Sequence, residues 1–185
     1  MEPAKPSRYV QVSPGADLTG ADLFKKTLRN TDLRNVNLTR ANLYHVDLTG
    51  SVLNRANLHK ANIYRANFRK ADLVHADLTE AKGQHAQFYK ANLSQANLRK
   101  ANLSQANFNQ ANLEKADLLG SNLEMANLSK ANLTQASLKH VNLRNANLLS
   151  ANLAHADLLG TVLKGVLWDE STIWPDGFVP PPQQL

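Results

Sequence analysis

A five-residue repeat restricts what this chain can fold into. The unit, A-[N/D]-L-x-x, starts at Ala16 and continues to Gly165, which makes thirty units within 185 residues. If the Leu position is called i, Leu occupies i in 25 units, Ala occupies i−2 in 22 units, and Asn or Asp occupies i−1 in 24 units. Such self-similarity is typical of repeat architectures, in which each unit buries one part of a shared core.

The period of five fits neither an ordinary helix nor a straight strand. At about 100° per residue, a helix would rotate each successive Leu by about 140° and scatter the leucines around its axis. A strand alternates with a period of two, so an odd repeat would place successive leucines on opposite faces. The chain must therefore turn once per unit. Asn and Asp at i−1 suit such turns because their short side chains bond nearby backbone groups. We expect i and i−2 to be buried, and i−1, i+1 and i+2 to be exposed.

Composition excludes several classes of protein. The sequence has no Cys, which excludes disulfide scaffolds, Cys-ligated metal centres and thiol nucleophiles. No run approaches the roughly 18 apolar residues of a membrane-spanning helix, and the N-terminus lacks the apolar segment of a signal peptide. We therefore expect a soluble, cytoplasmic protein without a membrane contact.

The repeat resembles the pentapeptide-repeat family over 150 of the 185 residues. The resemblance implies an all-β fold, a right-handed quadrilateral β-helix with four units per coil, and hence about 7.5 coils for thirty units. One spacing in the sequence agrees with a coil of twenty residues, because the pentapeptide ADLLG at 116–120 recurs forty residues later at 156–160.

The ends of the chain depart from the repeat and divide it into four segments. We expect an N-terminal cap at 1–15, the β-helix at 16–165, a C-terminal cap at 166–178 and a Pro-rich tail at 179–185, because open sheet edges need cover.

The C-terminal cap resembles that of cyanobacterial members. It either plugs the last coil, leaving a monomer, or forms a C-terminal dimer interface, as in dimeric members of the family. Its candidate residues are Trp168, Ile173, Trp174 and Phe178. Leu119, Leu149 and Leu159 form a second apolar candidate for self-association.

Two core positions break the pattern. Gly83 replaces the central Leu of its unit, which indicates either a tolerated bulge or void, or an irregularity that widens a groove. Lys26 stands at an i−2 position in the first coil, where we expect its ammonium to leave through the open end, because burial of an unpaired charge is costly.

Known catalytic motifs are missing from the sequence. It contains no G-x-S-x-G, no H-E-x-x-H, no phosphate-binding Gly loop and no EF-hand pattern. His45 and His85 would share a column two coils apart, about 10 Å by strand spacing, which is too far for one metal ion. We predict that the protein is not an enzyme and needs neither cofactor nor metal.

The surface is uneven in charge. Residues 16–100 hold 14 Lys and Arg against 7 Asp and Glu, whereas residues 101–185 hold 5 against 7. With four units per coil, aromatic and basic side chains fall into two neighbouring columns of the N-terminal half. We predict a partner-binding patch there, formed by Phe24, Lys25, Tyr44, His45, Tyr64 and Arg65. The alternative is that this ladder of similar side chains only stabilises neighbouring coils.

These observations favour a non-catalytic module or regulator that presents flat walls to a protein partner. Direct nucleic-acid binding through the basic half is the alternative, with phosphates neutralised by Lys and Arg and bases stacked on the aromatic rings. Some family members act on DNA gyrase by imitating duplex DNA. We rank that function third, because a DNA mimic needs an acidic rod and this chain carries a net charge of +6.

Overall fold

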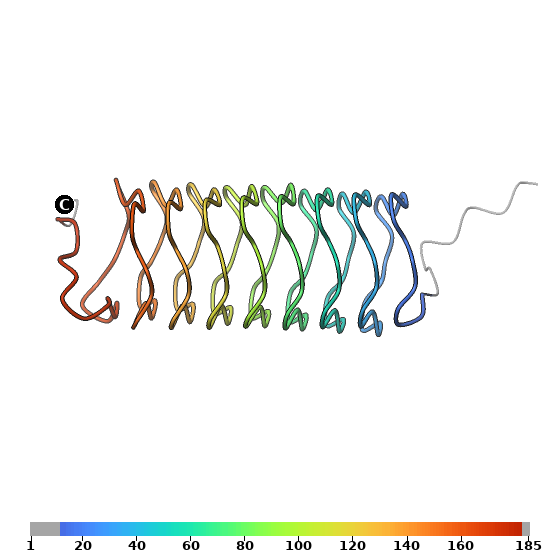
Figure 1. The fold of residues 1–185 in the computed structure, drawn as a ribbon, viewed down its shortest axis with the longest axis horizontal. Helices are drawn as coiled ribbons and strands as arrows, with labels where there is room; N and C mark the ends of the chain where they lie inside the picture. Colours follow the sequence, from blue (N-terminus) through green and yellow to red (C-terminus); the bar gives the residue numbers. More distant parts are fainter. Residues whose placement is uncertain (1–11, 183–185) are drawn as a thin grey trace, which may run out of the picture.

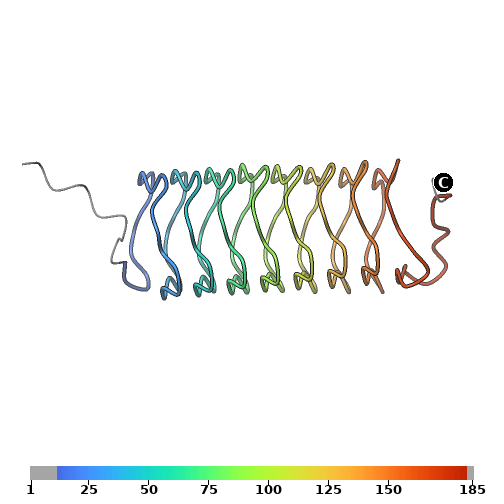
Figure 2. The same ribbon diagram turned by 180° about the vertical axis from the view of Figure 1, so that it is seen from behind.

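The computed structural model describes residues 12–182, which form a rod of stacked coils that follow one another in chain order from one end of the rod to the other (Figure 1, Figure 2). The described part of the chain has no helix and no extended strand, since each side of a coil holds a single-residue β-bridge. All 28 bridges are parallel, and 27 of them join residues twenty apart, from Asp17↔Asn37 to Asn147↔Leu167. Each coil therefore has four sides of five residues, so the fold is the predicted quadrilateral β-helix.

Every unit ends in the same tight turn. In all units but one, the N–H of the next unit's first residue donates to the carbonyl of residue i, as Ala21 does to Leu18 at 3.0 Å; the exception is Thr31, whose N–H donates to Ser51 Oγ. Residue i+2 takes a positive φ, and 25 non-glycine residues do so with φ between 52° and 60°. The side chain at i−1 accepts from the N–H of i+1, as Asn42 Oδ1 does from Tyr44 at 3.3 Å. These bonds explain why Asn and Asp are so frequent at i−1.

The i−1 side chains differ from the prediction in one respect, because most are half-buried rather than exposed. They lie in columns and bond to one another across coils. Asn62 Nδ2, for example, donates to Asn42 Oδ1 at 3.3 Å, and Asn132 Nδ2 donates to Asn112 Oδ1 at 3.1 Å. Each amide thus closes its own turn and also contacts the next coil.

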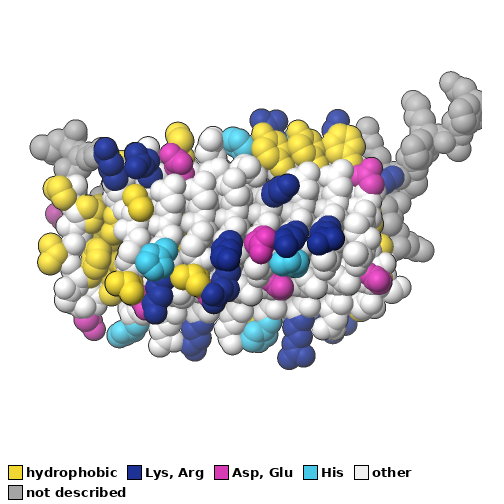
Figure 3. All heavy atoms as spheres, turned by 45° about the horizontal axis from the view of Figure 1, so that its top comes forward, with side chains coloured by type: hydrophobic (Ala, Val, Ile, Leu, Met, Phe, Trp, Pro, Cys, Tyr) yellow, Lys and Arg dark blue, Asp and Glu magenta, His cyan; other side chains and the backbone are white. Residues whose placement is uncertain are grey.

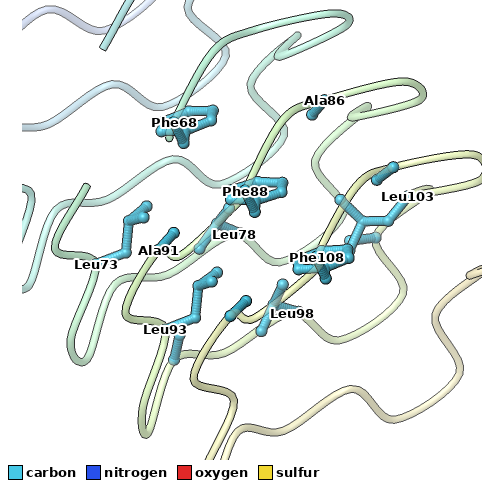
Figure 4. Close-up of a cluster of buried hydrophobic side chains, with 14 of the residues drawn as sticks. Phe68, Leu73, Leu78, Ala86, Phe88, Ala91, Leu93, Leu98, Leu103 and Phe108 are labelled. Atoms are coloured by element: carbon cyan, nitrogen blue, oxygen red, sulfur yellow. The ribbon is translucent and has the colours of Figure 1, made fainter. Parts of the chain in front are cut away.

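The core contains the residues at i and i−2, as the pattern predicts. Three successive coils carry Phe in place of Leu, and their rings stack with centroids 4.9 Å apart for Phe68–Phe88 and 4.7 Å apart for Phe88–Phe108 (Figure 4). All three rings are fully buried. Phe is larger than Leu, so these coils hold more side-chain volume on one side of the core than their neighbours do.

Gly83 is neither a void nor a bulge, and these two interpretations are wrong. A Cβ added at Gly83 would lie 2.8 Å from Leu103 Cδ2 and 2.9 Å from Ile63 Cδ1, so side chains from the adjacent coils already fill the space. The ladder is unbroken on either side, with Asn62↔Lys82 and Lys82↔Asn102 in register. The missing side chain is compensated by its neighbours.

The coil geometry extends past both ends of the predicted repeat. At the N-terminal end, Ala16 N–H donates to Ser13 O and Gly15 N–H donates to Arg34 O, so the first turn precedes residue 16. Residues 1–11 of the predicted N-terminal cap lie outside the described residues, and Lys26 is half-buried. At the C-terminal end, two further bridges form at Leu167 and Ile173, the second with an offset of 21 residues.

Asp169 accommodates the extra residue at the C-terminal end. In regular coils the N–H of i+2 donates to a backbone carbonyl of the following coil, as Lys130 does to Leu149. Ser150 donates instead to the Asp169 carboxylate, from its N–H at 2.9 Å and from its Oγ at 3.1 Å. Desolvation raises the pKa of Asp169, but the hydrogen bonds from Ser150 and Thr172 outweigh it, so the pKa is lowered overall.

Two serines occupy equivalent i−2 positions but differ in their bonding. Ser51 is fully buried, and its Oγ accepts from Thr31 N–H at 3.2 Å and donates to Leu28 O. Ser121 is equally buried, and its Oγ has no partner among the described residues. The same residue type at the same repeat position is therefore satisfied in one coil and unsatisfied in another.

We predict opposite effects for Ser51→Ala and Ser121→Ala on the free energy of unfolding. Ser51→Ala should lower it by about 1 kcal/mol, because Thr31 N–H loses its partner, whereas Ser121→Ala should raise it by about 1 kcal/mol, because an unpaired buried hydroxyl is removed. Urea unfolding followed by circular dichroism would measure both. Each variant is the other's control, and changes of the same sign would contradict the prediction.

Gly83→Leu should lower the free energy of unfolding by about 1–3 kcal/mol, because the added side chain meets Ile63 and Leu103 in an already filled core. Thermal unfolding of the variant beside the native chain would test this. A higher midpoint would mean that the two neighbouring side chains can withdraw and leave room.

Candidate interaction surface

The three predicted aromatic residues form a continuous ladder on one corner of the rod. The Phe24 and Tyr44 ring centroids lie 5.5 Å apart with tilted planes. Tyr44 and Tyr64 stack at 5.1 Å, with an interplanar angle of 9°. These contacts follow from the register, because residues twenty apart meet in adjacent coils. Stacking covers much of each ring face and leaves mainly the ring edges to a partner.

The predicted basic residues surround this ladder. Lys25 Nζ lies 4.8 Å from the Phe24 ring centroid, and the Arg65 guanidinium lies 5.4 Å from the Tyr64 centroid. His45 contacts Tyr44 at 4.7 Å between ring centroids. His85 meets the edge of Tyr64 at 5.4 Å. The structure thus brings together all six predicted contact residues, and Phe24 is the most exposed of the three aromatic residues in the ladder, at 43%.

A second cluster of aromatic and basic residues occupies the next corner along the coil. Arg69 and Lys90 both lie over the Tyr89 ring, at 5.2 Å and 5.3 Å from its centroid. A hollow of about 360 Å³ opens beside this ring. Its lining residues are Arg29, Thr49, Asn67, Arg69, Lys70 and Tyr89. The cluster is absent from the predicted contacts, although counting the sequence in steps of twenty at the next corner would have found it.

The two corners border one side of the rod, which we call the basic wall. It comprises residues 24–30, 44–50, 64–70 and 84–90, linked through the column Thr27, Asp47, Asn67 and Gln87. These ranges contain seven Lys and Arg and a single acid, Asp47. The other three sides of the same coils, residues 16–23, 31–43, 51–63 and 71–83, contain five Lys and Arg and six Asp and Glu. The excess positive charge of these coils therefore lies on one side.

Asp47 does little to neutralise the basic wall. Its carboxylate already accepts from Thr49 Oγ1 at 2.6 Å and from Asn67 Nδ2 at 3.2 Å, and it lies 3.4 Å from Arg29 Nε. Arg65, Arg69, Lys70 and Lys90 form no ion pair within the described residues. Figure 3 shows hydrophobic side chains gathered in a block near the N-terminal end of the rod, bordered by Lys and Arg.

The basic wall changes character along the rod. In the later coils the same side consists of residues 104–110, 124–130 and 144–150, which hold Lys130, Arg144 and Glu124 as their charged residues. The remaining surface positions there are mostly Asn, Gln and Ser. The later coils therefore offer a matched reference surface with the same backbone and little charge.

The C-terminal candidates form a separate cluster. Trp168 and Trp174 meet edge to face at 5.9 Å, and Trp174 stacks on Phe178 at 5.3 Å. Both Trp side chains pack against the core, whereas Ile173 is 52% exposed. An open hollow of about 490 Å³ lies beside Phe178 and Leu159.

The three leucines proposed for self-association do not form one patch. Leu119 is half-buried, and Leu159, which shares its corner, lies two coils away with Lys139 between them. Leu149 occupies a different corner. Leu119 and Leu159 lie two coils apart in one column and Leu149 lies in another column, so the repeat does not bring the three side chains together.

No group of three or more His, Cys, Asp or Glu side chains that could hold a metal ion occurs within residues 12–182. Over the same residues, no helix is long and apolar enough to cross a membrane.

Comparison with known proteins places the chain in a family. The family model "Pentapeptide repeats" matches in eight copies, which cover residues 16–55, 61–99, 86–124, 96–135 and 126–165. A search of curated proteins found no match.

Among solved structures, the chain is similar to HetL, a pentapeptide repeat protein involved in the regulation of heterocyst differentiation in the cyanobacterium Nostoc sp. strain PCC 7120. The two share 31% identity over 91% of this chain and 89% of HetL, with a TM-score of 0.59. Alr5209, from the same cyanobacterium, is 39% identical over 50% of this chain and 77% of its own, with a TM-score of 0.50. QnrB1, a plasmid-mediated fluoroquinolone resistance protein, has the same fold at 22% identity, covering 83% of this chain and 79% of that chain, with a TM-score of 0.63. The repeat, the twenty-residue register and these matches together show that the chain belongs to the pentapeptide repeat family.

Proposed function

We propose that the protein is a non-catalytic interaction module whose basic wall binds a protein partner. The observation that carries this proposal is the segregation of charge, since the first coils hold seven cations and one acid on one side and a slight excess of acid on the other three. The exposed Phe24, the half-buried Tyr side chains and the exposed Arg side chains of that same side are residue types enriched in protein interfaces. A role in regulation would agree with the similarity to HetL, which is involved in regulating differentiation.

The ladder could also serve stability alone, and its contacts favour a mixed role. Stacked rings are worth about 0.5–1.5 kcal/mol per pair, so the Tyr44–Tyr64 contact stabilises neighbouring coils. Stability would not require, however, that four cations at the two adjacent corners remain without acidic partners among the described residues, namely Arg65, Arg69, Lys70 and Lys90. This excess of cations is the part of the pattern that a partner explains.

Nucleic-acid binding is the second candidate, and the net positive charge of the wall supports it. The aromatic ladder supports it less than the sequence suggests, because the Tyr44 and Tyr64 faces are stacked on each other and are not free to stack on bases. Imitation of duplex DNA ranks lowest, because the most charged side of the rod carries the wrong sign.

A pull-down from a nuclease-treated lysate of the source organism would test the proposal. We expect one protein to be retained by the native chain and lost from a variant with Phe24→Ser, Tyr44→Ser, Tyr64→Ser and Arg65→Ser. The second variant, with only Lys25→Ser and Arg65→Ser, leaves the rings in place and should also weaken retention, because both cations face solvent.

The matched control is Arg144→Ser with Lys164→Ser, which changes two exposed cations on the same corner in the C-terminal half. It should retain the partner, and the melting midpoint of each variant would show that the fold is intact. Identical retention by all variants would contradict the proposal and leave the ladder with a structural role only.

A further inference from the structure

The candidate site extends over both corners of the basic wall. The predicted contact patch occupies one corner, but the structure continues it across the wall to Arg69, Lys70, Tyr89 and Lys90 on the next corner. The two corners enclose a flat strip with the half-buried Asn67 and Gln87 between them. A partner that contacts both corners must therefore lie over the strip and run along the rod.

The cations and aromatic rings of the wall indicate the chemistry of a partner. Four cations of the wall lack acidic partners, and they surround Tyr64 and Tyr89 rather than forming an even layer. Guanidinium groups pair well with carboxylates, and ring edges contact apolar side chains. The described residues of the wall also form no helix that could enter the major groove of duplex DNA. Its chemistry thus favours an acidic polypeptide segment that carries apolar residues beside its carboxylates.

The distance between successive coils of the wall can be compared with the repeat of a bound helix or strand. The coils of the wall repeat about every 4.8 Å, so four coils span about 14 Å between the first and the last. An α-helix laid along the rod repeats every 5.4 Å and spans about 16 Å in three turns. Residues on one face of an extended strand are about 6.6 Å apart and would span about 20 Å in three steps. A helix therefore keeps successive turns beside successive coils, whereas an extended strand falls out of step.

We propose that the basic wall binds an acidic amphipathic helix of a partner protein, lying parallel to the rod axis across residues 24–90. Glu or Asp side chains on each flank of that helix, repeated at i and i+4 along the flank, pair with the cations of the corner on that side, and its apolar side chains contact the edges of the aromatic rings. This inference rests on the proposed function, because it specifies the partner of the same surface.

Fluorescence anisotropy with purified full-length protein would test it. The probe is a labelled helical peptide with Glu at i and i+4 on one face and Leu beside it. One comparison peptide has the same composition with a central Pro that breaks the helix, and another has Lys in place of Glu. We expect the acidic helix to bind at least about tenfold more tightly than either, because only it offers both the charge and the spacing.

Variants locate the site on the wall. Arg69→Ser, Lys70→Ser and Lys90→Ser together should weaken binding of the acidic helix about tenfold. The control is Lys130→Ser with Arg144→Ser, which changes cations on the same side of the rod in later coils and should alter binding less than about twofold. All these side chains are exposed, so the fold should be unaffected, and the melting midpoint would verify this.

Three results would overturn the inference. Equal binding of the Pro-broken peptide would exclude a helix, and unchanged binding by the triple variant would exclude the wall. Tighter binding of an oligothymidylate at the same salt concentration would identify the ligand as nucleic acid. The pull-down distinguishes failure of this inference from failure of the proposed function. If the peptide titration fails but the pull-down still retains a protein, the interaction module stands and only the acidic helix is excluded as its ligand.

Discussion

The structure depends on one backbone relationship, the hydrogen bonding between residues in successive coils. At each side, the N–H groups of i and i+2 donate to the following coil and the N–H of i−1 donates to the preceding one, as Leu23, Lys25 and Asn42 illustrate. Because this bonding keeps the coil at twenty residues, positions twenty apart always become neighbours. Core and surface chemistry are therefore arranged in columns, and a similar residue every twenty positions becomes a ladder, whether of Phe inside or of Tyr outside.

The same register determines where the cations of the basic wall stand. Lys25, Arg65, Lys70 and Lys90 all occupy i+2, with φ values of 56°, 53°, 57° and 56°. Glycine adopts this conformation more easily than any residue with a Cβ, and it occupies i+2 at Gly20 and Gly120. Large charged side chains at i+2 thus carry a small conformational cost in each coil. On the basic wall, the i+2 position sets cations at the most exposed points of the turn, where they project from the rod and can reach a partner.

Much of the architecture could be predicted from sequence because the five-residue repeat corresponds directly to the twenty-residue register of the coils. The period of five, the Asn or Asp of each turn and the contacts of Phe24, Tyr44 and Tyr64 all follow from it. Other features depend on choices that the repeat leaves open. At Gly83 the side chains of Ile63 and Leu103 fill the missing space, and at Ser150 the carboxylate of Asp169 replaces a carbonyl. Neither rotamers nor a single inserted residue can be inferred from periodicity.

One corner of the basic wall was predicted, but its second corner, with Arg69, Tyr89 and Lys90, was missed because of the way charge was counted along the solenoid. Comparing the two halves of the chain detects a gradient along the rod, but a partner meets one side, and the sides alternate every five residues. The difference appears only when charges are counted for each side. The wall then has seven cations and one acid, whereas the other three sides of the same coils have five cations and six acids. Because the rings at both corners are held by stacking or by cation–π contacts in the unbound protein, the wall is ordered before a partner arrives. Binding then immobilises few side chains, which lowers the entropic cost of association. In the proposed interaction, the spacing of the charges on this rigid surface selects the partner, so the register that builds the core also sets the distance that the partner must match.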